Sequence, residues 1–430
     1  MVSASLDNLK IGVTNSLRFY DLGREIFLRA SSSLPNFKPL DTNSTWPNSI
    51  QVVDFFSGAG GTSLGFNALN SLGNIFRFLG GCDIDSTSAA SYSTNFGTPL
   101  QNRDVIDIAK DETSIINFLN ELAYSKSEPS VFIGGAPCQG FTSHRKRHWG
   151  KDDDKRNVLA TAFARIVEIA QPTAFLMENV PEFLSKKYRP YYSSCINLLE
   201  NAGYTVKKSI YNSAAFGVPQ ERYRSIIIGM RNDFCLPEDI YTFPEYRTVR
   251  SAIANLPPLA AGECSVDPLH RAIRHKASTV ETIKLVPHDG GYLPKGAGPA
   301  CRARTKGFAD IYGRLSWDKP SITITHYARN PASGRFVHPE QDRGLTAREA
   351  ARLQSFPDGF EFCGRSDDIY RQIGEAVPPL FACGIASFVL ANLVKANLTK
   401  DELASSRPSI EDPVSDSFSS VIAGMKVGRA

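Results

Sequence analysis

The sequence predicts an α/β fold in which a mostly parallel sheet is accompanied by a smaller, irregular domain. Apolar runs of strand length alternate with helical patterns between residues 50 and 231, as expected for parallel strands joined by helices. A glycine-rich turn at residues 57–66 follows the first apolar run and opens a helical segment. From residue 232 to about 313 this alternation disappears, and Pro, Gly and His recur. We therefore expect a doubly wound part and a second module.

The size and charge of the chain leave many functions open. Its 430 residues are enough for one large domain with a smaller companion, or for two or three domains. The hydrophobic content of 42% is ordinary for a globular protein. The net charge of +4 is compatible with a polyanionic partner, and it is equally typical of a solvated surface.

The spacing of the cysteines predicts no metal site. No two of them have CxxC spacing, so neither a zinc site nor a redox motif is indicated, and isolated cysteines in a long chain favour a reducing compartment. The first ten residues lack the basic start and apolar core of a signal peptide. No apolar run approaches the length of a membrane span, so we expect no membrane association. The cysteines are Cys82, Cys138, Cys195, Cys235, Cys264, Cys301, Cys363 and Cys383.

The two ends of the chain carry the weakest patterns. Residues 1–49 form an extension to which we assign no role; residues 16–30 have a weak helical pattern, and residues 31–47 have the composition of a linker. Residues 396–430 are polar and Ser-rich, and we expect a disordered tail.

The first strand and its turn predict a ligand site. Residues 50–56 are apolar, and the glycines of SGAGGTSLGF at 57–66 permit positive φ and a close approach of the backbone to a ligand. A tight turn without a ligand is the alternative. A second strand is expected at residues 78–82.

Three acids follow these strands. Asp83 ends the second strand, where a carboxylate can accept hydrogen bonds from ribose hydroxyls. Asp85 comes next, and Asp104 follows a polar stretch. Each of the three could equally cap a helix, which is the commoner role of Asp at such positions.

A candidate nucleophile follows the apolar run at residues 131–133. In GGAPCQGFTS, residues 134–143, Pro137 stiffens the turn and Cys138 is placed at the edge of the sheet. Arg145 and its basic neighbours lie downstream, and nearby cations favour the reactive thiolate. A buried, inert cysteine is the alternative. Six Lys or Arg residues lie between positions 145 and 156, either as a solvated face or as a phosphate-binding loop.

Two further segments bring polar side chains to the ends of strands. The apolar strand at residues 173–177 leads into Glu178, and a carboxylate there, beside a strand that leads to a cysteine, is a catalytic arrangement. A capping or surface Glu is the alternative. Gln220, Arg222 and Arg224 alternate, so an extended chain places them on one face, suited to a planar polar ligand or a phosphate.

The C-terminal part predicts two helices. Thr346 precedes Glu349 by three residues, which is a capping box at the start of a helix. Residues 380–394 are a final apolar helix, and IGEAVPP at 373–379 precedes it.

The order of these motifs resembles the cytosine-5 DNA methyltransferases. DFFSGAGG, an acid after the second strand, PCQG, ENV, QERYR, LTAREAARLQSFPD and IGEAVPP occur in the order of that family, over residues 50–395. The resemblance implies a Rossmann-like S-adenosylmethionine-dependent fold with a small target-recognition domain. It divides the chain into a main catalytic part at 50–231, a small domain at 232–363 and a terminal helix at 364–395 that completes the catalytic domain.

The resemblance also implies an activity and its residues. The enzyme would transfer a methyl group from S-adenosylmethionine, leaving S-adenosylhomocysteine, to C5 of a cytosine flipped out of duplex DNA. The implied catalytic residues are Cys138, which would bond covalently to C6, Glu178, which would stabilise the activated ring, and the pair Arg222 and Arg224, which would steady the base and the cofactor site. The implied cofactor residues are Phe56, Ser57, Gly58, Gly60, Gly61, Asp83, Ile84, Asp104, Pro137, Glu375, Ala376 and Val377. The implied substrate residues are Gln139, Ser143, Arg156, Asn179, Val180 and Gln220.

The chain departs from the family at Glu375, where Asn is usual. An extra carboxylate beside the carboxylate of the cofactor would repel it unless a cation lies nearby, or unless the side chain turns outward.

Three other activities compete with this one. A relative that methylates RNA would carry other residues in the loop after PCQ. A non-catalytic DNA-binding homologue would lack Cys138 or Glu178, and both are present. A nicotinamide oxidoreductase would leave PCQ and ENV unexplained.

The resemblance implies duplex DNA as partner, a monomer, and functional pairing with a restriction endonuclease if the chain is bacterial. A bacterial enzyme would act at the cytoplasmic nucleoid, and a eukaryotic one in the nucleus. Residues 232–313 would determine sequence specificity. A second candidate DNA contact is the segment 326–335. Four cations are either DNA contacts or solvated surface: Arg302, Arg304, Lys306 and Arg314.

Overall fold

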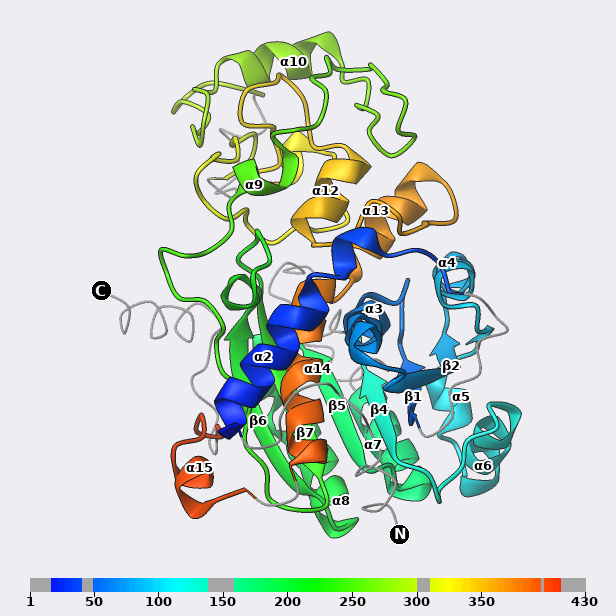
Figure 1. Cartoon of the computed structure of the whole chain (residues 1–430). Helices are drawn as coiled ribbons and strands as arrows, with labels where there is room; N and C mark the ends of the chain where they lie inside the picture. The colour runs from blue at the N-terminus through cyan, green and yellow to red at the C-terminus, as the bar shows by residue number, and fades with distance from the viewer. Residues whose placement is uncertain (1–16, 41–48, 138–157, 300–309, 396–397, 411–430) are drawn as a thin grey trace.

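The computed structural model describes residues 17–40, 49–137, 158–299, 310–395 and 398–410 (Figure 1). Within these residues, seven strands form one sheet in the order β3-β2-β1-β4-β5-β7-β6. Strands β3, β2, β1, β4 and β5 run parallel to one another, and β7 runs antiparallel to both β5 and β6. The strands are β1 (Ile50–Phe55), β2 (Phe76–Asp83), β3 (Leu100–Asn102), β4 (Ser130–Gly134), β5 (Ala174–Asn179), β6 (Thr205–Asn212) and β7 (Tyr223–Met230). The expected mostly parallel α/β fold is confirmed.

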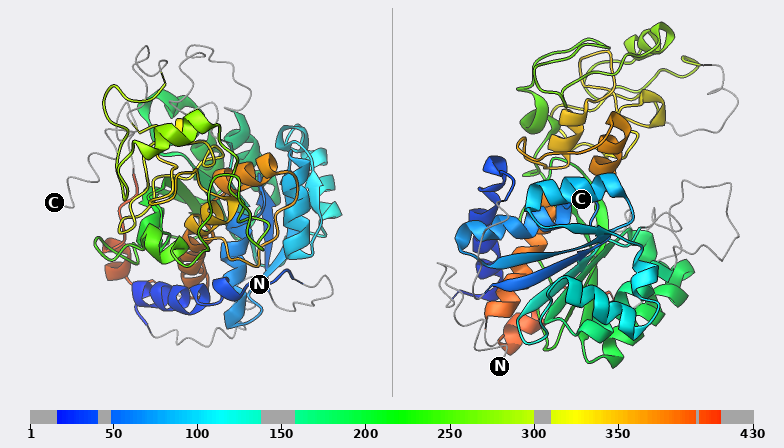
Figure 2. Two further views of the ribbon diagram at one scale, coloured as in Figure 1. Left: turned by 90° about the horizontal axis from the view of Figure 1, so that it is seen from above. Right: turned by 90° about the vertical axis from the view of Figure 1, so that its right-hand side faces the viewer.

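Helices cover both faces of the sheet, and each face has its own apolar core (Figure 2). Every residue of the central strands β1, β4 and β5 is buried, because helices pack on both sides. This explains why these strands are continuous apolar runs in the sequence. One face carries α2 (Phe19–Ser31), α3 (Gly61–Ala68), α4 (Ser86–Phe96) and α14 (Pro379–Val394), and the other carries α5 (Val105–Ile108), α6 (Glu112–Glu121), α7 (Leu159–Ala170) and α8 (Arg189–Asn201).

The last apolar helix, α14, packs between helices from the start of the chain (Figure 1). A Cβ atom on Gly65 of α3 would lie 2.4 Å from Ala382 Cβ, and one on Gly23 of α2 would lie 2.5 Å from the Phe388 ring. These close approaches need glycine. The weak helical pattern near residues 16–30 is therefore a real helix, and its apolar side belongs to the core.

Part of the expected disordered tail is ordered. Residues 398–410 contain α15 (Lys400–Ala404), whose Glu402 accepts a hydrogen bond from Phe19 N at 2.7 Å and pairs with Lys395 at 2.6 Å. Further on, Arg407 donates to Asp239 and to Ile210 O. The polar composition of this segment wrongly predicted disorder, because its polar side chains bond α15 and the residues after it to the sheet domain. Residues 411–430 lie outside the described part.

In the part of the chain that the structure describes, one helical stretch has the length and hydropathy of a membrane span. It is Ser366–Val394, which comprises α13 (Ser366–Glu375) and α14, and 89% of its apolar window is buried inside the protein. The sequence-based expectation that no such run exists was wrong, and burial in the core accounts for the apolar composition.

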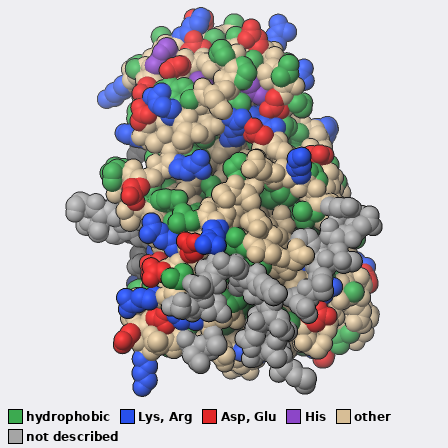
Figure 3. Space-filling model, in the orientation of Figure 1, with side chains coloured by type: hydrophobic (Ala, Val, Ile, Leu, Met, Phe, Trp, Pro, Cys, Tyr) green, Lys and Arg blue, Asp and Glu red, His purple; other side chains and the backbone are tan. Residues whose placement is uncertain are grey.

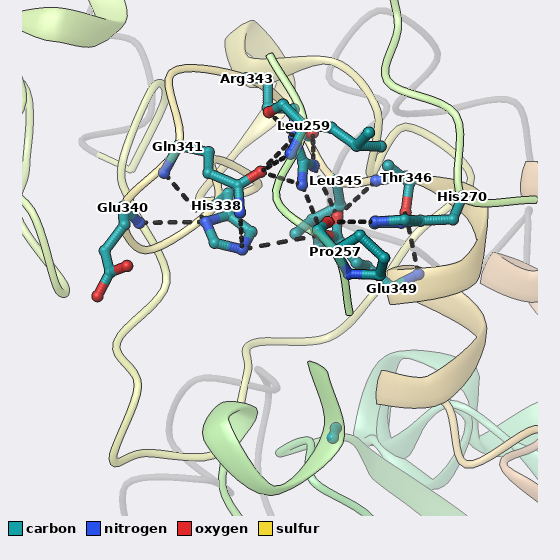
Figure 4. Close-up of polar contacts among 12 residues, drawn as sticks. Pro257, Leu259, His270, His338, Glu340, Gln341, Arg343, Leu345, Thr346 and Glu349 are labelled. Atoms are coloured by element: carbon teal, nitrogen blue, oxygen red, sulfur yellow. Dashed lines mark hydrogen bonds and ion pairs between the residues drawn. The ribbon is translucent and has the colours of Figure 1, made fainter. Parts of the chain in front are cut away.

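The small domain contains short helices and irregular chain and lies beyond one end of the sheet (Figure 1). Its interior holds a polar network (Figure 4) in which buried Arg343 donates to both carboxylate oxygens of buried Glu349, at 2.7 and 2.8 Å. Glu349 also closes the expected capping box with Thr346. The helices are α9 (Val249–Ile253), α10 (Ala277–Lys284) and α12 (Ala347–Leu353). Short 3-10 turns among the described residues of the chain are Leu34–Asn36, Leu69–Leu72, Pro181–Leu184, Lys186–Tyr188, Ser213–Phe216 and Pro331–Ser333.

Candidate active site

The glycine-rich loop joins β1 to α3 and is closely packed on one side. A Cβ atom on Gly61 would lie 2.3 Å from Val377 O and 3.3 Å from Ala376 Cβ, so residues 376–377 pack directly on the loop. Gly60, at φ 96°, faces the Phe96 ring in the same way. At Gly58, with φ 52°, a Cβ atom would meet nothing within 4 Å. The loop is therefore open at Gly58, where a ligand could approach the backbone.

Asp83 holds this loop to the end of β2. Its Oδ2 accepts a hydrogen bond from Gly58 N at 2.8 Å, and its Oδ1 accepts one from Asp85 N at 2.8 Å. Burial raises the pKa of Asp83. The next residue, Ile84, is 72% exposed, which is unusual for a large apolar side chain and suits contact with a ligand.

The other two acids act as helix caps, as the sequence allowed. Asp85 accepts from Ser88 N at 2.8 Å at the start of α4, and it also pairs with Arg371 of α13 at 2.7 Å. Asp104 accepts from Ile106 N at 2.9 Å at the start of α5.

Sequence reasoning missed Asp54, a carboxyl group beneath the loop. Asp54 is only 2% exposed and accepts a hydrogen bond from Ser63 Oγ at 2.6 Å. Burial raises the pKa of Asp54 to about 8, and nearby Asp83 adds to the shift. An acid inside an apolar strand is a signal that could have indicated this buried group.

The carboxylate of Glu178 lies at the end of β5, beside the end of β4. Arg224 Nε is 2.7 Å from Glu178 Oε1, and both side chains are largely buried. A Cβ atom on Gly135 would lie 3.8 Å from Glu178 Oε2 and 3.8 Å from Phe56 O. The residue after β4 therefore faces both the carboxylate and the glycine-rich loop.

Asn179 connects the ends of these two strands. Its Nδ2 donates to Ala136 O at 3.3 Å, and its Oδ1 accepts from Val180 N at 2.9 Å. The segment that continues to Pro137 is thus held against β5. Cys138, Gln139, Ser143 and Arg156 lie outside the described residues.

Gln220 and Arg222, like Arg224, are bound by protein groups. Gln220 is fully buried; its Nε2 donates to Gln354 Oε1 at 2.8 Å, and its Oε1 accepts from Ile324 N at 2.8 Å. Arg222 donates to Ile324 O at 2.9 Å and to Gly374 O at 3.1 Å. The expected substrate contact by Gln220 is therefore corrected: its amide is used to join the two domains.

Arg314 is also not available for DNA. It is fully buried, donates to Val286 O at 3.0 Å and His338 O at 3.1 Å, and pairs with Asp342. Both readings of Arg314, as a DNA contact and as solvated surface, were wrong, because it bonds carbonyl groups inside the small domain. Arg302, Arg304 and Lys306 lie outside the described residues.

The segment 326–335 lies against the end of α13. A Cβ atom on Gly374 would lie 2.1 Å from His326 N. Tyr327 is 53% exposed, whereas Arg329 pairs with Asp367 and Arg335 donates to Tyr292 Oη at 2.9 Å. On the face shown in Figure 3, Lys and Arg are interspersed with Asp and Glu.

The cysteines in the described residues are mostly poor candidates for a nucleophile. Cys82, Cys195, Cys235 and Cys383 are buried. Burial raises the pKa of Cys195 and Cys383 to about 12 and that of Cys235 to about 11. Cys264 is exposed and Cys363 half-buried, and neither contacts Glu178 in any described interaction. No group of three or more His, Cys, Asp or Glu in the described part could hold a metal ion.

Two cavities among the described residues lie away from this site. One, of about 250 Å³, is bounded by the turns at Leu34–Asn36 and Leu69–Leu72. The other, of about 560 Å³, lies in the small domain beside α10.

The fold and the site together define a class of α/β transferases that use a nucleoside cofactor. The sheet is mostly parallel, the glycine-rich loop follows β1, an acid ends β2, and a carboxylate–arginine pair joins β5 and β7. Residues 50–390 match the family model for the C-5 cytosine-specific DNA methylase. The chain belongs to this family, and it is a DNA (cytosine-5)-methyltransferase. The family and the fold imply methylation that depends on S-adenosylmethionine.

Similar proteins agree with this assignment. The Type II methyltransferase M1.HphI of Haemophilus parahaemolyticus is 36% identical over 80% of this chain and 87% of its own length. The Type II methylase M.HgiDII of Herpetosiphon aurantiacus is 31% identical over 76% of this chain and 91% of its own length. Among solved structures, a DNA modification methyltransferase encoded within an E. coli prophage has a TM-score of 0.58 at 25% identity, covering 80% of this chain and 99% of its own.

Proposed function

We propose that this chain methylates C5 of cytosine in duplex DNA, with Cys138 as the nucleophile and Glu178 as the group that stabilises the activated ring. The observation that carries this proposal is the Glu178–Arg224 pair, 2.7 Å apart, beside Gly135 at the end of β4. Cys138 follows Gly135 by three residues in the sequence.

The residues around the glycine-rich loop fit a nucleoside cofactor. The loop is open at Gly58, Asp83 is fixed beside it by two backbone hydrogen bonds, and Ile84 is exposed. Asp83 would accept from ribose hydroxyls, and Phe56 and Ile84 would pack on the base. The bound S-adenosylmethionine would supply an electrophilic methyl group. Ser57, Gly60, Gly61, Ala376 and Val377 would shape the rest of the site, and Asp104 would lie near the adenine.

The protein groups would then act on the cytosine ring in order. Cys138 Sγ adds to C6, and the electrons of the C5–C6 bond move into the ring, so that C5 becomes nucleophilic. Glu178 hydrogen-bonds N3 and the amino group, and Arg224 holds this carboxyl group in place. After C5 has gained the methyl group, its proton passes to water, the C6–S bond breaks and the thiolate returns.

The two domains of the protein would have separate roles, one in catalysis and one in DNA recognition. Residues 50–231 and 364–395 would form the catalytic domain, and residues 232–363 the recognition domain, with sequence specificity in 232–313. Because C6 is inaccessible in stacked DNA, the base must be flipped out. Gln139, Ser143, Arg156 and Val180 would contact DNA or the flipped base. Asn179, whose buried amide bonds Ala136 O and Val180 N, would hold the ends of β4 and β5 together. We propose that the enzyme acts as a monomer, in functional pairing with a restriction endonuclease.

Trapping with DNA that contains 5-fluorocytosine tests the nucleophile, because fluorine blocks the last proton loss. The wild-type chain and Cys195→Ala, whose thiol is buried in α8, should form a covalent adduct, and Cys138→Ala should not. An adduct with Cys138→Ala would show that the assignment is wrong.

Two further experiments test the substrate. Competition between duplex DNA and tRNA separates DNA from RNA methylation; preference for tRNA would contradict the proposal. Bisulfite sequencing of plasmid DNA from cells that express the chain would reveal the methylated sequence.

A further inference from the structure

Asn102, the last residue of β3, fastens the turn that follows β2. The ladder between these two parallel strands ends where Asp83 is paired with Asn102. The Asn102 side chain continues the bonding beyond that pair, because its Nδ2 donates to Asp83 O at 3.0 Å and to Ile84 O at 2.8 Å. One exposed amide on a three-residue edge strand therefore holds the main-chain carbonyl groups of two successive residues.

The glycine-rich loop holds the same turn from its other side. Gly58 N donates to the Asp83 carboxylate, which also accepts from Asp85 N, both at 2.8 Å. Asp83 is thus fixed through its side chain by the loop and through its carbonyl group by β3. The Ile84 side chain is 72% exposed and gains little restraint from packing. Its position therefore depends on main-chain bonds such as the one from Asn102.

We propose that Asn102 is a positioning residue for the cofactor, because it holds the two residues that would contact the nucleoside half of S-adenosylmethionine. The inference rests on the proposed function, in which Asp83 accepts from the ribose hydroxyls and Ile84 packs on the base. A binding segment that is already ordered loses less conformational freedom when its ligand arrives. Asn102 acts through these two residues and needs no contact with the ligand.

Two substitutions remove the clamp in different ways. Asn102→Ala removes the whole amide, whereas Asn102→Asp keeps the shape of the side chain but cannot donate when it is ionised. Since the Asn102 side chain is exposed, neither change opens a cavity in the core, and both variants should fold.

Titration calorimetry without DNA would give Kd for S-adenosylmethionine and for S-adenosylhomocysteine. In both variants each Kd should rise by about three- to twentyfold, since each lost hydrogen bond is worth about two- to tenfold in an equilibrium constant. The factor should be the same for the two ligands, because they share the nucleoside half. KM for S-adenosylmethionine should rise in parallel while kcat stays within about twofold, because ground-state and transition-state binding are weakened alike.

Asn70 provides the matched control, because it holds the main chain at the other end of β2. Its Nδ2 donates to Phe76 O at 3.0 Å, and its Oδ1 accepts from Phe76 N at 2.8 Å. At about 3.3 Å per residue along the strand, this clamp lies roughly 23 Å from Asp83. Asn70→Ala should lower Tm but leave Kd for both ligands within about twofold of the wild-type values.

A Kd in Asn102→Ala within about twofold of the wild-type value would overturn the inference. Equal rises in Asn102→Ala and Asn70→Ala would also overturn it, because any loosening of β2 would then weaken binding. Failure of the wild-type chain to bind either ligand would instead reject the proposed function, so the two failures are distinguishable.

Discussion

Separating Glu178 from Arg224 is the perturbation that tests the proposed site most directly. The two groups are 2.7 Å apart, and their side chains are only 12% and 13% exposed. Two unit charges about 4 Å apart attract by about 4 kcal/mol at an effective dielectric constant of about 20. Desolvation offsets part of this attraction. We therefore expect a coupling of about 2–3 kcal/mol, which is about 30- to 150-fold in rate.

A double-mutant cycle measures this coupling. Glu178→Gln, Arg224→Met and the double variant would be compared by kcat/KM for methyl transfer to duplex DNA. In each single variant kcat/KM should fall by at least about 100-fold. The carboxylate is removed in Glu178→Gln, and it is no longer held in position in Arg224→Met. The double variant should be about 30- to 150-fold more active than the product of the two losses.

A surface ion pair provides the control. Arg77 and Glu128 are 2.6 Å apart but are 33% and 47% exposed, so Arg77→Met and Glu128→Gln should leave kcat/KM unchanged. If the losses of kcat/KM in Glu178→Gln and Arg224→Met simply multiply in the double variant, the coupling is below about 0.5 kcal/mol. That result would refute the idea that Arg224 acts through Glu178.

Three further predictions concern stability. Gly61→Ala should lower Tm clearly, since the new Cβ atom would lie 2.3 Å from a backbone carbonyl, and an unchanged Tm would contradict this packing. Asp54 has a raised pKa of about 8, so the folded state keeps a proton that the unfolded state loses at lower pH. The free energy of unfolding from urea titrations should therefore fall as pH rises from about 5 to 8, by up to about 1.4 kcal/mol per pH unit. Asp54→Asn should flatten this slope, and equal slopes in the variant and the wild type would show that Asp54 does not cause the pH dependence. Glu402→Ala should cost about 1–3 kcal/mol in urea unfolding, because Phe19 N and Lys395 lose their partner, whereas an unaffected midpoint would mean that α15 does not stabilise the domain.

The parts of the fold that depend on local patterns were predictable from the sequence. The buried strands β1, β4 and β5 are continuous apolar runs, and the Thr346 capping box starts a helix because its hydrogen bonds join residues three positions apart. The order of the strands also brings Glu178 next to Gly135, since the ends of neighbouring parallel strands meet at one edge of the sheet.

The use of each polar side chain was decided by partners far away in the sequence. Gln220 and Arg314 have the composition of ligand-binding residues, yet both are buried and satisfy groups that only the fold brings together. The polar segment around Glu402 is ordered because its carboxylate meets the first turn of α2, 383 residues away.

The sequence alone therefore determined the architecture and the edge of the sheet where the chemistry is proposed, because hydrophobic periodicity and turn composition act over a few residues. Tertiary structure decided which partner each charged group has there. Arg224 meets a carboxylate, and Arg222 meets carbonyl groups. Glu375, at the end of α13, is attracted by Arg371. A charged side chain is stabilised by whichever partner the packed chain presents, and no local pattern encodes that partner.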